Sequence, residues 1–377
     1  MGELFCGPGG LGLAAQLATQ DFQDKVFGIE HAWATDKDPA ACNTYQNWFF
    51  PTDPDRVVNA DISEEGLFAR LKEKSQVDAM SFGFPCNDFS IVGERKGTNG
   101  DYGPLYSYCV KALDTFNPIW FLAENVRGLH QANNADTFQI ILRELALSGK
   151  GYKLYPHLYK FEEYGVPQAR HRIIIVGIRE DQECVFHVPS TAPFKDRDVS
   201  CRTALEKPLD SATANQEPTR QSATVISRLK STNPGENAFT ADLPDHLKLN
   251  ISGATLSQIY KRLDPKKPSY TITGSGGGGT HVYHWEEPRA LTNRERARLQ
   301  TFPDKFTFLG KKEQVRRQIG MAVPPEGASV IFTAILKTFA GIEYDFIPQN
   351  IPAPPKQTET QEVLSFVSSG ASLNGGG

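Results

Sequence analysis

The first 180 residues alternate short apolar segments with longer amphipathic ones, and this alternation restricts the possible folds more than any other feature. The apolar segments predict strands at residues 4–5, 32–35, 77–82, 119–123, 152–159 and 172–177. Helical periodicity returns at residues 292–301, 311–318 and 327–339, and the apolar spacing of the last segment suits packing against the first domain. The pattern predicts an α/β fold, with a mostly parallel sheet and helices on both faces.

The alternation stops after about residue 180. Up to residue 288 the chain is rich in Pro, Ser, Thr, Asn and Gly, and it includes a glycine run at 274–279. A chain of 377 residues is long enough for a second, smaller domain. We therefore predict a first domain at 1–179, a loop-rich domain at 180–288, and a return segment at 289–344 whose last helix packs on the first domain. Residues 345–377, rich in Pro, Ser, Gly and Gln, are predicted to be a disordered tail.

Cysteine usage and hydropathy indicate the compartment. The six cysteines show no CxxC pair and no short disulfide-like spacing, which favours a reducing compartment and argues against a metal site. No basic leader precedes an apolar stretch at the N-terminus, and no apolar stretch is long enough to span a bilayer. We expect a cytoplasmic protein without membrane association.

Charge is distributed unevenly along the chain. The net charge is −4, yet residues 258–320 carry 13 Lys and Arg against 6 Asp and Glu. A solvated helix face would explain Arg294, Arg296 and Arg298 alone. Basicity that continues through loops is more typical of a surface that meets phosphates, so the segment indicates a nucleic-acid partner.

Three successive strand ends carry groups that suit a nucleoside. Residues 3–11 form a strand, a glycine-rich turn and a helix start, where backbone can approach a ligand closely. Asp36 ends the second strand and could accept both hydroxyls of a ribose, and Asp61 follows the next strand, where it suits the exocyclic amine of an adenine. Each feature alone is more often a tight turn or a helix cap. Together they favour a nucleoside cofactor.

A proline and a cysteine follow the strand at residues 77–82. Pro85 restricts the backbone, so Cys86 is expected at a rigid corner beside the strand ends, as a nucleophile would be. A buried structural thiol is the commoner fate of a free cysteine. Partners for a nucleophile are nevertheless present at neighbouring strand ends, which favours the catalytic interpretation.

Those partners are a glutamate and two arginines. Glu124 directly follows four apolar residues, so we expect partial desolvation to favour its protonated form and make it a proton donor. Arg170 and Arg172 lie two apart at a strand start and are expected on one face. There they could favour the Cys86 thiolate and hold the substrate. A capping or salt-bridged glutamate is the alternative for Glu124.

These motifs, in this order, resemble those of the DNA cytosine-5 methyltransferases, particularly the single-chain bacterial enzymes of restriction-modification systems. The resemblance covers residues 1–344. It rests on the glycine turn at 5–11, Pro85-Cys86, Glu124-Asn125-Val126, Gln168-Ala169-Arg170-His171-Arg172, and the segments 289–295 and 318–324. Two positions depart from the usual pattern: Asn87-Asp88 stands where a glutamine commonly follows the cysteine, and Met321 stands where an asparagine is usual.

The resemblance implies a Rossmann-like catalytic domain that binds S-adenosylmethionine and a target-recognition domain at 180–288. The catalytic residues would be Cys86, Glu124, Arg170 and Arg172. The cofactor residues would be Phe5, Gly7, Gly9, Gly10, Leu11, Asp36, Lys37, Asp61, Ile62, Pro85, Leu105, Met321 and Ala322. We expect DNA contacts from Ser90, Gln168, Lys266, Lys267, Thr271 and Thr273. The implied partners are double-stranded DNA and a cognate restriction endonuclease, and the protein is expected to act as a monomer.

The implied reaction begins with addition of the Cys86 thiolate to C6 of a flipped cytosine, while Glu124 contacts N3 and the amine and Arg172 steadies the carbonyl. The glycine-rich segment 87–104 would close over the base. Two other hypotheses remain at this point: a tRNA cytosine-5 methyltransferase and a catalytically inactive DNA-binding regulator. A nicotinamide oxidoreductase is disfavoured, because the glycine spacing is wrong for that class.

Overall fold

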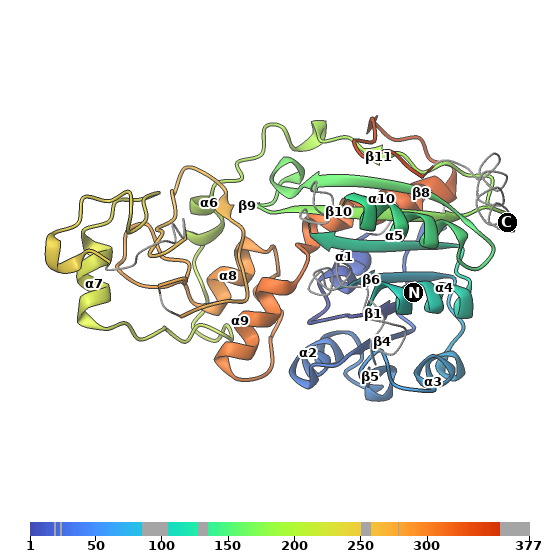
Figure 1. The fold of residues 1–377 in the computed structure, drawn as a ribbon, viewed down its shortest axis with the longest axis horizontal. Coiled ribbons are helices and arrows are strands. Elements are labelled where there is room, and N and C mark those ends of the chain that lie inside the picture. Colours follow the sequence, from blue (N-terminus) through green and yellow to red (C-terminus); the bar gives the residue numbers. More distant parts are fainter. Residues whose placement is uncertain are drawn as a thin grey trace, which may run out of the picture.

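A computed structural model describes residues 1–18, 20–22, 25–84, 105–126, 135–249, 258–277 and 279–354. Its centre is a seven-stranded sheet in the order β5-β4-β1-β6-β7-β10-β8 (Figure 1). The strands are β5 (Val57–Asn59), β4 (Trp33–Asp36), β1 (Gly2–Leu4), β6 (Ala79–Gly83), β7 (Trp120–Val126), β10 (His171–Arg179) and β8 (Tyr152–Lys160). All pairs from β5 to β7 are parallel, and β10 is antiparallel to both of its neighbours. The predicted α/β class with a mostly parallel sheet is confirmed.

Helices cover both faces of this sheet because its central strands are apolar on both sides. Side chains of α3 (Leu67–Lys74), α4 (Tyr106–Phe116) and α5 (Ala135–Leu147) form one core with Phe82 and Phe121. Side chains of α1 (Gly10–Leu17) and α10 (Pro325–Ala340) form a second core on the other face with Leu122 and Ile174. Helix α2 (Pro39–Phe49) packs beside β4 and β5. The predicted return of the last helix to the first domain is therefore observed.

One helical stretch, Lys312–Ala340, is long and apolar enough to cross a membrane, with a mean hydropathy of 1.5. It consists of α9 (Lys312–Met321) and α10, and Pro324 and Pro325 lie at the break between them. In the fold, 72% of an apolar 18-residue part of this stretch is buried. Its hydropathy is that of helices that contribute to a protein core.

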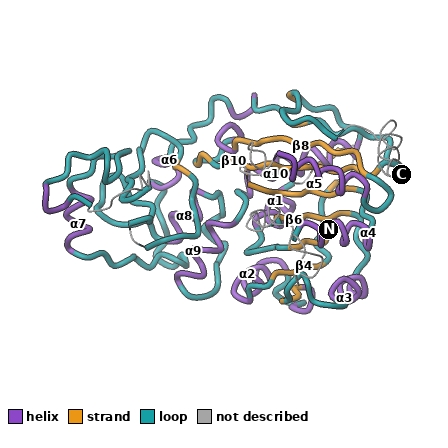
Figure 2. The backbone as a smooth tube through the Cα atoms, in the orientation of Figure 1, coloured by secondary structure: helices purple, strands orange, loops and turns teal. Residues whose placement is uncertain are grey.

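The second lobe is built mainly from loops (Figure 2). Its helices are α6 (Cys201–Leu205), α7 (Ala223–Lys230), α8 (Asn293–Leu299) and α9. A core formed by side chains such as Ile272, Phe302 and Ile319 joins its loops to α8 and α9, which lie between α7 and the sheet in Figure 1. The short strand β12 (Ser269–Tyr270) pairs with β9 (Gln168–Ala169), so the two lobes share backbone hydrogen bonds.

Smaller elements complete the described chain. The hairpin of β2 (Gln20–Phe22) and β3 (Lys25–Phe27) was not predicted from the sequence. Short 3-10 helices lie at η1 (Pro54–Arg56), η5 (Phe161–Tyr164), η6 (Ala192–Phe194) and η7 (Asp245–Leu247). They connect the main elements without adding a further layer.

Two segments differ from the sequence-based expectation. Contacts with the sheet continue past residue 180, because Phe186 and β11 (Val188–Pro189) pack into the core under α10. The expected disorder from residue 345 is wrong for residues 345–354. There β13 (Phe346–Ile347) pairs with β11, and Ile351 is 1% exposed. The polar composition of this segment gave no indication that Ile347 and Ile351 would pack against the core. Residues 355–377 lie outside the described chain.

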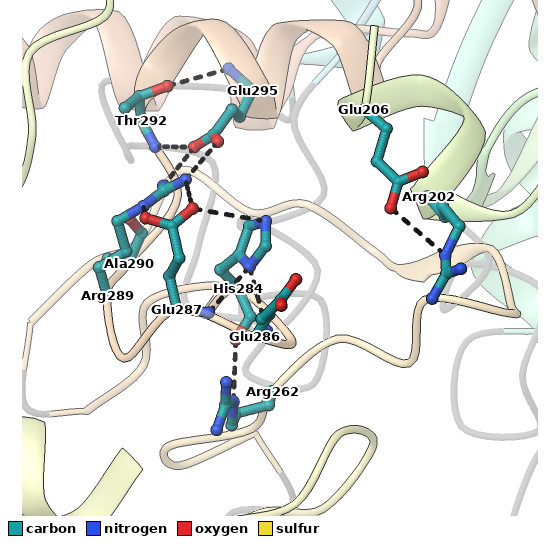
Figure 3. Close-up of polar contacts among 10 residues, drawn as sticks. All are labelled: Arg202, Glu206, Arg262, His284, Glu286, Glu287, Arg289, Ala290, Thr292 and Glu295. Atoms are coloured by element: carbon teal, nitrogen blue, oxygen red, sulfur yellow. Dashed lines mark hydrogen bonds and ion pairs between the residues drawn. The ribbon is translucent and has the colours of Figure 1, made fainter. Parts of the chain in front are cut away.

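Helix α8 begins with reciprocal capping contacts (Figure 3). The Thr292 hydroxyl accepts a hydrogen bond from the Glu295 backbone N–H at 3.2 Å, and the Glu295 carboxylate accepts one from the Thr292 N–H at 2.7 Å. Arg289 donates to both carboxylate oxygens of Glu295, each at 2.8 Å. Three residues of the 289–295 motif thus fix where the chain enters the helix.

Replacing Thr292 with alanine should lower the free energy of unfolding by about 1 kcal/mol, because the first turn of α8 would lose its side-chain acceptor. Thr292→Ser keeps the hydroxyl and should stay close to wild type. Urea denaturation of the three proteins measures the effect. An alanine variant as stable as wild type would show that this cap does not stabilise the lobe.

Candidate active site

A cavity of about 150 Å³ lies at the carboxyl ends of the parallel strands, where ligands bind in open α/β sheets. Residues at the ends of β1, β4, β5, β6 and β7 line it, and the connection from α9 to α10 closes one side. The residues that were predicted to bind the cofactor and that line this cavity are Phe5, Gly7, Gly10, Leu11, Asp36, Lys37, Asp61, Ile62, Leu105, Met321 and Ala322. Gly9 lies outside the lining, and Pro85 lies outside the described residues.

The glycine turn at the end of β1 depends on left-handed backbone and close packing. Gly7 and Gly9 have φ values of 52° and 97°, which side chains disfavour. A Cβ on Gly10 would lie 2.6 Å from the Val323 carbonyl oxygen, whereas a Cβ on Gly7 would meet no atom within 4 Å. Phe5 also has a positive φ, of 52°. The turn is therefore held tightly from behind, while Gly7 leaves space on the cavity side.

Asp36 holds the backbone around the cavity. One of its carboxylate oxygens accepts the N–H of Gly7 and the other accepts that of Asp38, both at 2.9 Å. Burial raises the pKa of Asp36, and the two backbone hydrogen bonds oppose that shift. Each carboxylate oxygen has lone-pair capacity for a second donor. Asp36 can thus support the glycine turn and still receive a hydroxyl group of a ligand.

Asp61 lies at the rim of the cavity. One of its oxygens accepts the Ser63 hydroxyl at 2.6 Å and the Ser63 N–H at 3.0 Å, and these contacts lower the pKa of Asp61. The neighbouring Ile62 is 7% exposed and forms part of the apolar wall. The rim therefore presents an ionised carboxylate beside an apolar surface.

Glu3 is a lining residue that the sequence interpretation did not identify. Its side chain is 2% exposed and accepts the Tyr45 hydroxyl at 2.9 Å. Burial raises the pKa of Glu3 to about 8, and the hydrogen bonds from Tyr45 and from the Gly12 backbone oppose the shift. A carboxyl group within an otherwise apolar first strand was the available signal for a special environment.

Glu124 and Arg172 form an ion pair at the other end of the cavity. Nε of Arg172 lies 2.8 Å from Oε1 of Glu124, and each side chain is 12% exposed. The pairing of β6 with β7 sets Gly83 opposite Glu124, and a Cβ on Gly83 would lie 3.1 Å from Oε2. We expected a desolvated carboxyl group. The group is largely shielded from water, and it also has the cationic partner that the alternative interpretation named, with its second oxygen towards the end of β6.

Asn125 supports the backbone that leads to Cys86. Its amide donates to the Phe84 carbonyl at 3.0 Å, and its side-chain oxygen accepts the Val126 N–H at 2.7 Å. The residue is 1% exposed, so these contacts are shielded from water. Asn125 therefore fixes the last described residue before the Pro85-Cys86 pair. Cys86 and Ser90 lie outside the described residues.

The two arginines of the 168–172 motif point to different partners. Arg170 is 1% exposed and donates to the carbonyls of Ile272 at 2.9 Å and Gly320 at 3.1 Å. It also donates to the Met321 carbonyl at 3.4 Å, a contact that does not depend on the side chain at position 321. Arg172 faces Glu124 instead. The expectation that both guanidinium groups face one substrate is corrected, because Arg170 joins the two lobes.

The expectation for Gln168 is also corrected. It was expected to contact DNA, but it is 0% exposed and bridges three segments. Its amide donates to the Leu299 carbonyl at 3.2 Å and to the Gln300 side chain at 2.9 Å, and its oxygen accepts the Ile272 N–H at 2.8 Å. All three partners lie more than 100 positions away along the chain, so no local pattern could indicate them.

The other residues expected at DNA lie on the second lobe. Lys266, Lys267 and Thr273 are exposed. Lys267 is within 3.3 Å of Asp264, and the Thr273 hydroxyl contacts that of Ser275. Thr271 is half-buried and donates its hydroxyl to the Ala169 carbonyl. Thr273 and the two lysines are therefore accessible to a ligand, whereas the Thr271 hydroxyl is used in a hydrogen bond to the protein backbone.

The profile of the C-5 cytosine-specific DNA methylases matches residues 1–337. Among curated relatives, the type II methyltransferase M.BbvI of Brevibacillus brevis is 54% identical, with 96% of this chain and 99% of that protein covered. The type II methyltransferase M.NgoFVII of Neisseria gonorrhoeae is 36% identical, with 90% and 86% covered.

Two crystal structures share the fold. A prophage-encoded DNA modification methyltransferase of Escherichia coli has a TM-score of 0.66 and 24% identity, with 90% of this chain and 99% of that chain covered. The Dnmt2 methyltransferase of S. pombe has a TM-score of 0.58 and 18% identity, with the same coverage. At these identities the likeness extends to the fold.

The buried carboxyl group of Glu3 predicts a pH-dependent stability. Below the ordinary pKa of 4.5, Glu3 is protonated in folded and unfolded chains alike. As pH rises from 4.5 to about 8, only the unfolded chain ionises, so the free energy of unfolding falls, and above about 8 this loss is complete. Glu3→Gln cannot ionise and should gain stability relative to wild type across this window. Denaturant titrations over the window measure the difference, and a difference that stays constant would contradict the assignment.

Proposed function

This chain belongs to the C-5 cytosine-specific DNA methylases, and we propose that its sheet-edge cavity is where a methyl group passes from S-adenosylmethionine to carbon 5 of a cytosine in DNA. One observation carries the proposal. A single cavity connects the glycine turn and Asp36 at one end with Gly83 and Glu124 at the other. A methyl donor bound at the first end would meet a base held at the second.

The residues of the cavity fit the proposed cofactor. Gly7 leaves open space where any side chain would project, so a ligand can approach the backbone there. Asp36 would receive the ribose hydroxyls, and Asp61 with Ile62 would hold the adenine. Phe5 and Leu105 would supply apolar contacts. When bound, the cofactor supplies a methyl group on a positively charged sulfur. These residues have only to hold it at the carboxyl edge of the sheet.

The reaction needs a nucleophile because carbon 5 of an aromatic cytosine is unreactive. We propose that the Cys86 thiolate forms a bond to C6, which moves electron density onto C5 and N3. Glu124 contacts N3 and the exocyclic amine and supplies a proton or hydrogen bond there. After C5 has taken the methyl group, loss of the C5 proton restores the double bond and releases the Cys86 thiolate. The target base must leave the duplex to reach these groups.

The ion pair with Arg172 gives Glu124 one orientation. Oε1 is held by the guanidinium group, so Oε2 is directed to the end of β6, from which Pro85 and Cys86 continue. Asn125 fixes the Phe84 carbonyl on the same path. We assign Arg172 a contact with the cytosine carbonyl, and we assign Asn125 and Arg170 positioning roles. This division explains why only one arginine of the 168–172 motif pairs with a residue that lines the cavity.

The second lobe is proposed to recognise double-stranded DNA. We expect the protein to work as a cytoplasmic monomer paired with a restriction endonuclease, as the type II names of its relatives suggest. A tRNA substrate is the alternative function. The 54% identity to a type II methyltransferase favours DNA over that alternative.

Duplex DNA that contains 5-fluorocytosine should trap a covalent complex with the wild-type protein, because fluorine cannot leave as the C5 proton does. Cys86→Ser should give no adduct and no methyl transfer, since a hydroxyl is a far weaker nucleophile. Cys184→Ser, at a half-buried position outside the cavity lining, is the matched control and should behave as wild type. Denaturing electrophoresis detects the adduct, and its absence in wild type with cofactor present would refute the mechanism.

Asp36→Ala should weaken binding of S-adenosylmethionine by about 1.5–3 kcal/mol, because a charge-assisted hydrogen bond to the ribose is lost. Asp55→Ala removes an exposed carboxylate from η1 and should leave binding unchanged. Calorimetric titration of both variants makes the comparison. If the two variants bind S-adenosylmethionine equally well, Asp36 only accepts backbone hydrogen bonds and does not contact the cofactor.

A further inference from the structure

Two arginines in the second lobe are buried without an anionic partner. Arg296 of α8 is 1% exposed, and its Nε and Nη1 make no hydrogen bond. Its remaining contact joins Nη2 to Nδ1 of His281 at 3.3 Å. Arg316 of α9 is 7% exposed, its Nε makes no hydrogen bond, and its Nη2 donates to the Gly276 carbonyl at 3.4 Å. Neither arginine forms an ion pair with another described residue.

The two guanidinium groups lie close enough to influence each other. Burial lowers the pKa of Arg296 to about 10, and the charge of Arg316 contributes to the shift. Burial, Arg296, Arg316 and Lys312 together lower the pKa of His281 to about 4, so His281 is neutral and does not balance the charge of the two arginines. Concentrated positive charge of this kind costs stability unless an anion approaches it.

Other buried groups nearby are satisfied internally. Arg294, on the same helix as Arg296, donates to the carbonyls of Ala214, Pro303 and Phe306. Glu295 is engaged by Arg289. Arg262 of the same lobe leaves only Nη2 without a partner, whereas Arg296 leaves both Nε and Nη1 and Arg316 leaves Nε. This concentration of unpaired donors points to a ligand.

Glycine backbone packs against Arg316 and against His281, the residue that contacts Arg296. A Cβ on Gly276 would lie 2.5 Å from Nε of Arg316 and 2.8 Å from Cε1 of His281, so only glycine fits so close to the guanidinium group. Thr273, Ser275 and Gly277 are exposed on the outer side. The hydrogen bonds of the described residues use no backbone N–H of residues 273–277. The segment thus combines exposed residues with backbone N–H groups that no described residue accepts, and Arg316 lies against its Gly276.

We propose that the backbone of residues 273–277, with Arg296 and Arg316 behind it, forms a binding site for one phosphodiester group of the DNA strand. The N–H groups bond the phosphate oxygens, and the two guanidinium groups supply the charge. Because glycine carries no side chain, the phosphate can approach the backbone closely. The site rests on the proposed function, since DNA supplies its ligand, and it makes a contact independent of base sequence.

The test is duplex binding by the full chain as a function of salt. Arg316→Gln should reduce affinity about tenfold or more for all duplexes. It should also lower the slope of log affinity against log salt by about 0.9, the value for one phosphate contact. Arg316→Lys keeps the charge and should keep most of the slope. Arg70→Gln removes an equal charge from an exposed position on α3 and should match wild type.

Thermal unfolding without DNA separates this site from a structural role. Removing one of two mutually repelling buried charges should leave Arg316→Gln as stable as wild type or more stable, whereas a structural arginine would leave it less stable. Arg296→Gln is the second variant and should behave in the same way. Inorganic phosphate, compared with chloride at equal ionic strength, should raise the melting temperature of wild type more than that of either variant.

The site would be overturned if Arg316→Gln and Arg296→Gln bound duplexes with unchanged affinity and salt slope. The proposed function would still stand if the wild-type protein formed the 5-fluorocytosine adduct. A wild-type protein that neither binds nor methylates DNA would instead refute the proposed function. If phosphate stabilises wild type but the variants bind DNA normally, the site takes free phosphate only and the DNA assignment is wrong.

Discussion

The pairing of β6 with β7 is the constraint on which the site depends. It places Gly83 opposite Glu124, so the carboxylate lies beside the strand end that continues into Pro85 and Cys86. A shift of one residue in this register would turn Glu124 to the opposite face of the sheet. Buried apolar residues on both faces, such as Phe82 and Leu122, prevent that shift. The sheet core thus sets the geometry of the proposed acid and nucleophile.

A buried polar network extends this geometry to the second lobe. Gln168, Arg170 and Gln300 hold the backbone of Ile272, Ile319 and Gly320 through hydrogen bonds that are closed to water. Gly320 is essential to the packing, because a Cβ there would lie 2.0 Å from the Gly274 nitrogen. Loss of any one of these three side chains would leave a buried donor or acceptor unpaired. The lobe proposed to hold DNA is therefore fixed by the motif that also delivers Arg172.

Local patterns predicted the features that depend on local sequence. Strand positions followed from apolar runs, and Asp36 and Asp61 could be placed at the cavity because they lie at or just after the ends of strands. The inward orientation of Gln168 and the lobe-joining role of Arg170 depend on partners more than 100 residues away. Ile351 anchors a segment whose composition suggested disorder. A solvated helix face would have explained Arg296, but the fold buries it together with Arg316.

The most direct test of the account is to identify the methylated nucleoside. Duplex DNA is incubated with the purified protein and S-adenosylmethionine, digested to nucleosides and examined by mass spectrometry, with tRNA treated in parallel. The arrangement of Glu124 and the strand end that leads to Cys86 predicts 5-methylcytosine in the DNA. Methylation of an exocyclic amine, or methylation of tRNA alone, would contradict it.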